Sequence, residues 1–192
     1  SSLDLSSGSI SMEAGVILEQ LHQSLEGTGL IFPMHLGSEG SAQVGGLIAT
    51  NAGGSHAFRY GMMQDLVLGL EVVLADGTVW NGMRAVQKDN AGYQLRKLFC
   101  GSEGTLGIVT RAILKLSAEP KQQLTALLAV RDASGLVKLA TKLRAEGGEF
   151  LTALEFFSDV GLGIALENIP GLVFPLQSRA SFYLIVEAGS GS

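Results

Sequence analysis

The sequence predicts an α+β fold, and three observations support this class. Segments that alternate apolar with polar residues, as strands do, are interspersed with segments whose apolar residues recur at helical spacing. Turn signals separate these segments, the clearest being the Asp76-Gly77 pair between two strand-like stretches. The composition and the predicted pattern of elements change at Pro120, from a glycine-rich region to one with the order β-α-β-α-β. We therefore expect two domains, residues 1–118 and residues 119–192.

The first region is expected to consist mainly of short strands. Residues 9–14 alternate as a strand, residues 16–25 have helical spacing, and Gly27 ends that helix. Further extended segments are expected at residues 30–33, 67–75, 78–80 and 107–116, with a short helix over residues 94–99. In the last strand, the residues expected to share one face are Ile108, Ala112, Leu114 and Leu116.

In the second region, residues 119–192, the sequence predicts three strands and two helices. The strands are expected over residues 123–130, 150–156 and 181–188. Asp132 is expected to cap a helix that ends at Gly147-Gly148, and Ser158 to cap a second helix that runs through Leu166. This order predicts a small sheet covered on one face by helices.

Bulk composition excludes several classes of protein. With 46% hydrophobic residues, the 192-residue chain can form a sizeable core and is not disordered. The net charge of −5 and the lack of a Lys/Arg run exclude a nucleic-acid partner. No apolar run is long enough for a membrane span. The lone Cys100 and an N-terminus without a signal pattern lead us to expect a cytoplasmic protein.

Glycine is the most unusual feature of the composition. The chain contains 26 glycines, and they cluster at residues 37–61 and 101–107. Residues 40–58 carry no Asp, Glu, Lys or Arg. An uncharged, polar, glycine-rich segment can lie against a buried polar ligand without burying an unpaired charge. A ligand held by the main chain and a loop-rich domain without one are equally compatible with this composition.

The common phosphate, metal and nucleophile motifs are absent. There is no P-loop, and no G-x-G-x-x-G follows a strand. The Gly-Ser-Glu-Gly at residues 101–104 does not match a nucleophile elbow. Glu39 and Glu103 could form an acid/base pair, but capping or solvent-exposed roles are favoured because glycine flanks both. We expect no metal site, because metal-ligand spacing is lacking among His22, His35 and His56.

Four blocks of sequence resemble the vanillyl-alcohol oxidase/p-cresol methylhydroxylase (PCMH) superfamily of flavoproteins. The first block, residues 33–54, reads PMHLGSEGSAQVGGLIATNAGG. The others are RYG with DLVLGLEVVLADG (59–61 and 65–77), KDNAGY (88–93) and GSEGTLGIVT (101–110). Within the superfamily, the blocks are most similar to FAD-linked D-2-hydroxyacid dehydrogenases, which include D-lactate and D-2-hydroxyglutarate dehydrogenases and the FAD subunit of glycolate oxidase.

The resemblance implies a PCMH-type FAD-binding subdomain, with FAD as cofactor, followed by the start of an α+β, ferredoxin-like cap domain. It assigns cofactor contacts to three segments: Pro33, Leu36, Gly37, Ser38 and Glu39; Gly45, Gly46, Leu47, Ala49, Thr50, Asn51 and Gly53; and Glu103, Gly104, Gly107, Ile108 and Val109.

Few cationic side chains lie near these glycines, so main-chain amides are expected to hold the FAD diphosphate. Gly45-Gly46 are expected to open a short helix whose N-terminus favours an anion. For Thr50 and Asn51, a hydrogen bond to the flavin and a turn-capping role are equally compatible with the sequence.

The implied reaction is oxidation of a small D-2-hydroxy acid, of the lactate, glycolate or 2-hydroxyglutarate type, to the 2-oxo acid by hydride transfer to flavin. The upstream glycine loop and the histidine-rich C-terminal half of the family have no counterpart here. We therefore expect an internal segment that is inactive by itself, and we assign no catalytic residue. Arg59 is interpreted as a structural residue in preference to a partner of the substrate carboxylate. The alternative is a non-catalytic flavin-fold subunit or interaction module, which forms a homodimer or pairs with the missing parts of the fold.

Overall fold

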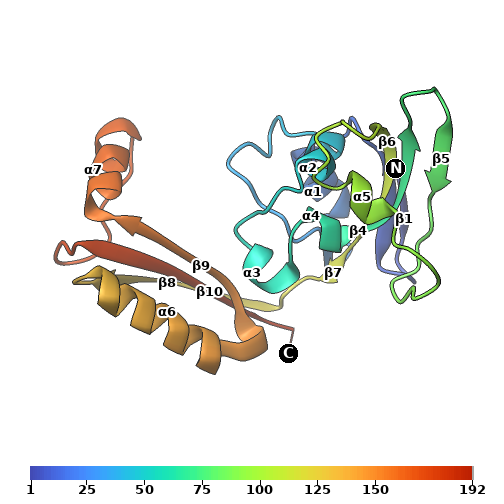
Figure 1. Cartoon of the computed structure of the whole chain (residues 1–192). Coiled ribbons are helices and arrows are strands. Elements are labelled where there is room, and N and C mark those ends of the chain that lie inside the picture. The colour runs from blue at the N-terminus through green and yellow to red at the C-terminus, as the bar shows by residue number, and fades with distance from the viewer. Residues whose placement is uncertain (192) are drawn as a thin grey trace. The chain divides into compact units, whose positions relative to one another are not determined.

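The computed structural model describes residues 1–191 (Figure 1). The chain divides into two compact units, Ser1–Glu119 and Pro120–Ser192, which are described separately. The sequence placed this boundary one residue earlier, after residue 118. The predicted α+β class is confirmed, because antiparallel sheets and separate helices make up both units.

Five antiparallel strands form the main sheet of the first unit, in the spatial order β1-β2-β6-β4-β5. They are β1 (Ser2–Asp4), β2 (Ser9–Glu13), β4 (Val67–Val73), β5 (Val79–Gly82) and β6 (Ile108–Lys115). In β2 the predicted alternation is confirmed, since Ile10 and Met12 are buried and Glu13 is exposed. The predicted turn at Asp76-Gly77 connects β4 to β5, and Gly77 has the positive φ of 84° that such a turn requires.

The expected face of β6 is partly wrong. Ala112, Leu114 and Leu116 are buried, but Ile108 is 63% exposed. The reason is a β-bulge: Glu71 pairs with Arg111 and Val72 with Val109, so Thr110 is the extra residue. An extra residue shifts the alternation by one position, so side chains before the bulge change face.

Short helices and a small two-stranded sheet complete the first unit. The helices are α1 (Leu18–Leu25), α2 (Val44–Ala49), α3 (Ala57–Tyr60), α4 (Met63–Leu66) and α5 (Arg96–Phe99), and β3 (Leu30–Ile31) pairs with β7 (Ser117–Ala118). Helix α1 buries Leu18, Leu21 and Leu25, which the helical spacing predicted. Each buried leucine stabilises the fold by about 1.5 to 3 kcal/mol, so α1 is anchored by packing despite its length of two turns.

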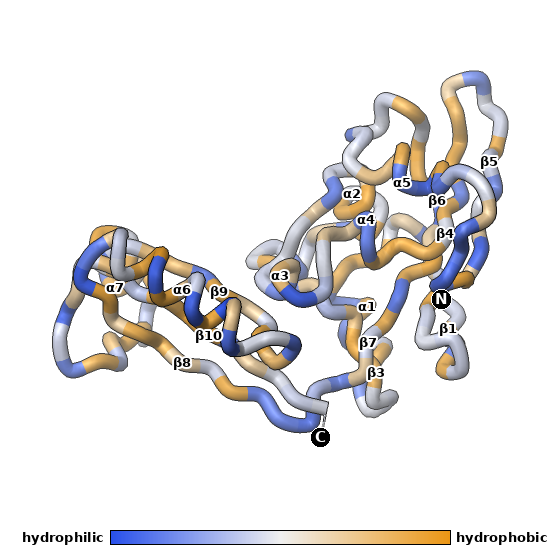
Figure 2. The backbone as a smooth tube through the Cα atoms, turned by 60° about the horizontal axis from the view of Figure 1, so that its bottom comes forward, coloured by the Kyte–Doolittle hydropathy of each residue, from blue (hydrophilic) through white to orange (hydrophobic). Residues whose placement is uncertain are grey.

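The second unit is a three-stranded antiparallel sheet with two longer helices. Its strands have the order β8-β10-β9. The elements are β8 (Gln122–Val130), α6 (Ala133–Gly147), the 3₁₀ turn η1 (Gly148–Phe150), β9 (Leu151–Ser158), α7 (Asp159–Asn168) and β10 (Phe182–Ser190). Hydrophobic and hydrophilic residues alternate along the turns of α6 (Figure 2). Helix α6 packs its apolar residues against the sheet around Leu184.

Both predicted helix caps are confirmed. The Asp132 carboxylate accepts a hydrogen bond from the Gly135 amide at 2.7 Å, and the Ser158 hydroxyl accepts one from the Gly161 amide at 3.2 Å. The prediction that helices cover one face holds for α6. The first turn of α7 is instead bonded to Tyr183, whose side chain lies on the opposite face of β10 from Leu184. No helix of the described residues is long and apolar enough to cross a membrane.

Candidate functional site

The predicted site residues lie on three segments of the first unit. The first segment, residues 33–39, follows β3, the second contains α2 and the residues after it, and the third leads into β6. Main-chain hydrogen bonds connect the second and third segments. The Gly101 amide donates to the Ile48 carbonyl at 3.0 Å, and the Glu103 amide donates to the Ala49 carbonyl at 2.9 Å. The structure therefore brings both glycine clusters to the C-terminal end of α2.

The C-terminal end of α2 explains the roles of Thr50 and Asn51. Asn51 has a left-handed φ of 48°, its amide donates to the Ile48 carbonyl, and the Ala52 amide donates to the Leu47 carbonyl. This pattern is a Schellman motif, in which asparagine is the usual substitute for glycine. The Asn51 Oδ1 accepts a hydrogen bond from the Gln64 amide at 2.9 Å, and the Thr50 hydroxyl donates to the Gly46 carbonyl at 2.9 Å. Both residues thus have the capping role that the sequence allowed.

The N-terminal end of α2 is only in part the open anion site that the sequence suggested, since two of its amides are already bonded. The Val44 amide donates to the Val16 carbonyl at 2.9 Å, and the Gly45 amide donates to the Ala14 carbonyl at 2.8 Å. These are the first two amides of the helix, so they are not available to a phosphate. The prediction of an anion at this N-terminus is wrong for both amides.

Apart from Gly104, whose positive φ of 79° favours glycine by itself, the glycines of the predicted site fall into two groups. In the first, a side chain would collide with the protein itself. A Cβ at Gly45 would lie 2.8 Å from the Ala14 Cβ, one at Gly53 would lie 2.6 Å from the Met62 Sδ, and one at Gly107 would lie 2.8 Å from the Val73 carbonyl oxygen. Internal packing therefore favours glycine most strongly at Gly45 and Gly107, whereas at Gly53 the flexible Met62 side chain can move aside.

Gly37 and Gly46 form the second group, because the space beside them is open. A Cβ at either position would meet nothing within 4 Å, and neither residue has a positive φ. Packing and backbone conformation therefore give no reason for glycine at these two positions. Gly15, which the sequence prediction did not include, shares both properties. A group outside this chain that approaches the main chain closely would supply the reason.

Unbonded amides accompany the open glycines. Residues 36–39 form a turn in which the Glu39 amide donates to the Leu36 carbonyl at 3.1 Å. Within residues 1–191, the amides of Gly37, Ser38 and Gly46 have no hydrogen-bond acceptor. These donors match the acceptors of a diphosphate, and the missing Cβ atoms give it room. The residues present therefore fit the FAD that the sequence blocks implied.

The remaining predicted residues differ in their surroundings. Pro33 and Leu47 are buried, so their side chains contribute to the core. Glu103 is exposed and has a left-handed φ of 50°, a strained conformation for this residue type.

Two further residues that the sequence analysis discussed lie near these segments. Arg59 lies over the Tyr60 ring, 5.3 Å from its centroid. Cys100 is not a nucleophile, because burial raises the pKa of its thiol to about 11.

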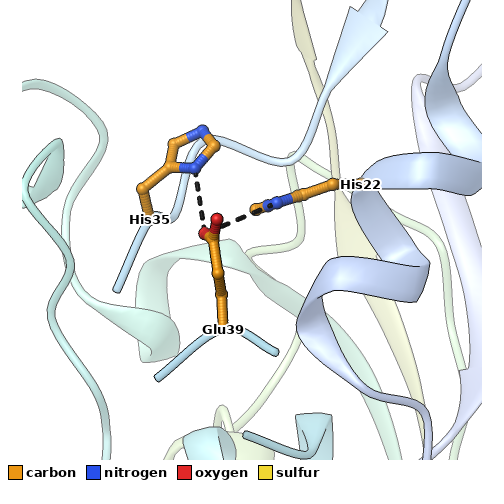
Figure 3. Close-up of side chains that lie close together, drawn as sticks. All are labelled: His22, His35 and Glu39. Carbon is orange, nitrogen blue, oxygen red and sulfur yellow. Dashed lines mark hydrogen bonds and ion pairs between the residues drawn. The ribbon is translucent and has the colours of Figure 1, made fainter. Parts of the chain in front are cut away.

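The Glu39 carboxylate points toward two histidines rather than into solvent (Figure 3). Its Oε2 lies 3.2 Å from the His35 Nδ1 and 3.7 Å from the His22 Nδ1. Burial and the neighbouring His35 lower the pKa of His22, against the opposite effect of Glu39. The sequence analysis, which compared only spacing along the chain, did not foresee this cluster.

Known proteins share both the sequence and the fold of this chain. Residues 1–82 match the protein family described as an FAD binding domain. This part of the chain is therefore similar to an FAD-binding domain. D-2-hydroxyglutarate dehydrogenase from Bos taurus is 42% identical over 185 residues, which cover 96% of this chain and 34% of that protein. D-2-hydroxyglutarate–pyruvate transhydrogenase from Saccharomyces cerevisiae is 39% identical over 186 residues, covering 97% of this chain and 37% of that protein.

A solved structure of alkyldihydroxyacetonephosphate synthase has the same fold, with a TM-score of 0.76 at 20% identity. The match covers 98% of this chain and 36% of that chain. The sequence matches confirm the predicted resemblance to FAD-linked D-2-hydroxyacid dehydrogenases, and the solved structure shows the same fold. The chain spans about a third of the length of each of these relatives.

Proposed function

We propose that this protein is part of an FAD-dependent oxidoreductase that oxidises a D-2-hydroxy acid to the 2-oxo acid. The substrate class is that of lactate, glycolate and 2-hydroxyglutarate. The names of the relatives favour 2-hydroxyglutarate, since two proteins that match almost the whole chain are described as acting on it. The observation that carries the proposal is the pair of open glycines, Gly37 and Gly46, with unbonded amides beside them.

In this proposal the first unit binds and orients the cofactor. The amides of Gly37, Ser38 and Gly46 hold the diphosphate, because they are donors without acceptors among the described residues. Main-chain hydrogen bonds connect the C-terminal end of α2 to the loop at residues 101–104. These bonds fix the positions of Asn51 and Glu103, which both have left-handed backbone conformations. FAD, when bound, supplies the hydride acceptor for the reaction.

The described residues bind and position the cofactor, and we assign the base that removes the hydroxyl proton to none of them. The lone, half-buried Cys100 supports a reducing location, and we retain the cytoplasm as part of the proposal.

Anaerobic reduction of the whole oxidoreductase, of which this protein is proposed to be a part that is inactive by itself, tests this function. We expect the FAD-loaded oxidoreductase to lose its visible flavin absorbance when D-2-hydroxyglutarate is added, and to keep it when the L-enantiomer is added. A protein that binds FAD and is reduced by neither D-2-hydroxyglutarate nor D-lactate would instead support a non-catalytic flavin-fold subunit.

A further inference from the structure

All three histidines of the chain lie together, although they come from three separate segments. His22 lies on α1, His35 follows β3, and His56 precedes α3. The ring centroids of His22 and His35 are 4.5 Å apart, and those of His35 and His56 are 5.4 Å apart. Their spacing of 13 and 21 residues matches no local motif, so only the tertiary fold brings them together.

His22, His35 and Glu39 have the separations of metal ligands. One ligand atom from each residue lies within 4.8 Å of the other two. Two ligands bound to Zn²⁺ at about 2.0 to 2.2 Å in tetrahedral geometry lie about 3.3 Å apart. The carboxylate-to-imidazole distances of 3.2 and 3.7 Å are already close to this value. The third pair is the two imidazole nitrogens of His22 and His35, which lie within 4.8 Å of each other. The His35 side chain is 46% exposed and so is free to rotate toward His22.

The two nitrogens of the His22 ring have different surroundings. Its Nδ1 lies 3.7 Å from the Glu39 Oε2. The Nε2 of His22 is buried and has no hydrogen-bond partner among the described residues. Because the ion would bind beside Glu39, the ligand atom of His22 is its Nδ1, and the Nε2 is the other nitrogen of the ring.

A cavity of about 220 Å³ gives access to the cluster. His22 and His35 both line it, together with the carboxylates of Glu26 and Glu119. The two carboxylates are not ligands in the cluster, but their charge attracts a cation into the cavity. An ion therefore has both a path to the imidazoles and a favourable potential along it.

We propose that His22, His35 and Glu39 bind one Zn²⁺ ion and leave a fourth coordination position open to water. Two imidazoles and one carboxylate are a ligand set that suits zinc, whereas Mg²⁺ prefers oxygen ligands alone. The ion connects α1 to the turn at residues 36–39. It thereby holds in place the loop on which Gly37 and Ser38 present their amides.

Calorimetric titration of the tag-free, chelator-treated protein with ZnCl₂, in the absence of FAD, tests the site. We expect one Zn²⁺ per chain, no comparable binding of Mg²⁺, and a higher melting temperature with Zn²⁺. Because loss of an outer-sphere partner alone weakens metal binding by about 10- to 100-fold, Glu39→Gln and His22→Gln are each expected to weaken it by about 100-fold or more. Glu39 is partly exposed and glutamine has its shape, so this variant keeps the fold, which circular dichroism verifies.

Glu26→Gln is the matched control, because it removes a carboxylate from the same cavity without removing a ligand. Its Zn²⁺ affinity is expected to stay within about threefold of the wild type, since a single charge at the surface contributes little. The proposal is overturned if the wild type binds no Zn²⁺, or if Glu26→Gln and Glu39→Gln weaken binding equally. FAD binding is measured separately, so failure of the zinc site does not imply failure of the flavin site, and the reverse also holds.

Discussion

The two units differ in how the first main-chain amides of their helices are hydrogen-bonded. In the second unit, α6 and α7 begin with the side-chain caps Asp132 and Ser158, each bonded to an amide three residues ahead. In the first unit, α1 and α2 have no side-chain cap. Their first amides are bonded to carbonyls of distant segments, as when Leu18 donates to Ala42. The second unit is therefore built from local signals, and the first depends on tertiary contacts.

This difference determines what each unit can do. Main chain packed against main chain requires glycine, and the same glycine-rich segments leave a few amides unbonded. The first unit is accordingly the one that we assign to the cofactor.

The largest effect is expected from Gly54→Ala in the first unit. A Cβ at this position would lie 2.6 Å from the His35 carbonyl oxygen and 2.9 Å from its nitrogen, and main-chain atoms cannot rotate away. We expect a loss of about 3 kcal/mol in the free energy of unfolding, as for severe overpacking. Gly37→Ala, which meets nothing within 4 Å, is the control and should unfold like the wild type in urea. Equal destabilisation of both variants would contradict the division of the glycines into two groups.

In the second unit, Tyr183→Phe should lower the free energy of unfolding by about 2 kcal/mol, because the partly buried Ala180 amide loses its acceptor and the Asp159 carboxylate loses a donor. The fully buried Tyr183 hydroxyl donates to the Asp159 carboxylate and accepts from the Ala180 amide, both at 2.9 Å. Urea unfolding followed by hydrogen exchange of the β10 amides measures the change. An unaltered exchange pattern would show that this hydroxyl contributes nothing to the second unit.

A smaller effect is expected from removing a cap. Asp132→Ala should destabilise the second unit by about 1 kcal/mol, because the Gly135 amide loses its acceptor. Asp132→Asn should cost much less, since asparagine caps about as well as aspartate. Exchange rates of the first amides of α6 report the change, and similar rates in both variants would count against the cap.

The smallest effect is a pH dependence of the second unit. The hydrogen bond from Arg179, which outweighs desolvation, lowers the pKa of Asp159 below its ordinary value of 3.8. In acid the folded protein therefore binds fewer protons at Asp159 than the unfolded chain does. The ionised Asp159 stabilises the fold above pH 3.8, and this stabilisation is lost as the pH falls through the lowered pKa. The stability of Asp159→Asn should depend less steeply on pH below 4 than that of the wild type. Parallel pH profiles would rule out this role of Asp159.

The contrast between the units also explains what could be predicted from the sequence. Asp132, Ser158 and the strands beside them carry local signals, and the predicted elements of the second unit were found. Ile108 was assigned to the wrong face because a bulge at Thr110 depends on the register with β4. The first amides of α2 were predicted to bind an anion, but they donate to the carbonyls of Ala14 and Val16. The sequence could not show this, because these carbonyls come from another segment.

The same limit applies to the candidate site. The sequence blocks predicted the segments that contact the flavin, but they could not separate Gly45, which packs against Ala14, from its neighbour Gly46, which faces open space. The cluster of His22, His35 and Glu39 was missed because its members meet only after α1 and the loop after β3 have packed together. Pairing of distant segments is the information that a spacing argument lacks.

The FAD affinities of Gly45→Ala and Gly46→Ala, measured by quenching of flavin fluorescence, test the central claim most directly. Gly46→Ala should leave the fold intact or stabilise it by about 0.5 kcal/mol, because its Cβ has room and alanine restricts the unfolded chain. It should nevertheless bind FAD about tenfold more weakly, which corresponds to about 1.4 kcal/mol. Gly45→Ala should lose stability by about 1 to 3 kcal/mol, from its clash with Ala14. A Gly46→Ala protein that binds FAD as tightly as the wild type would contradict the account.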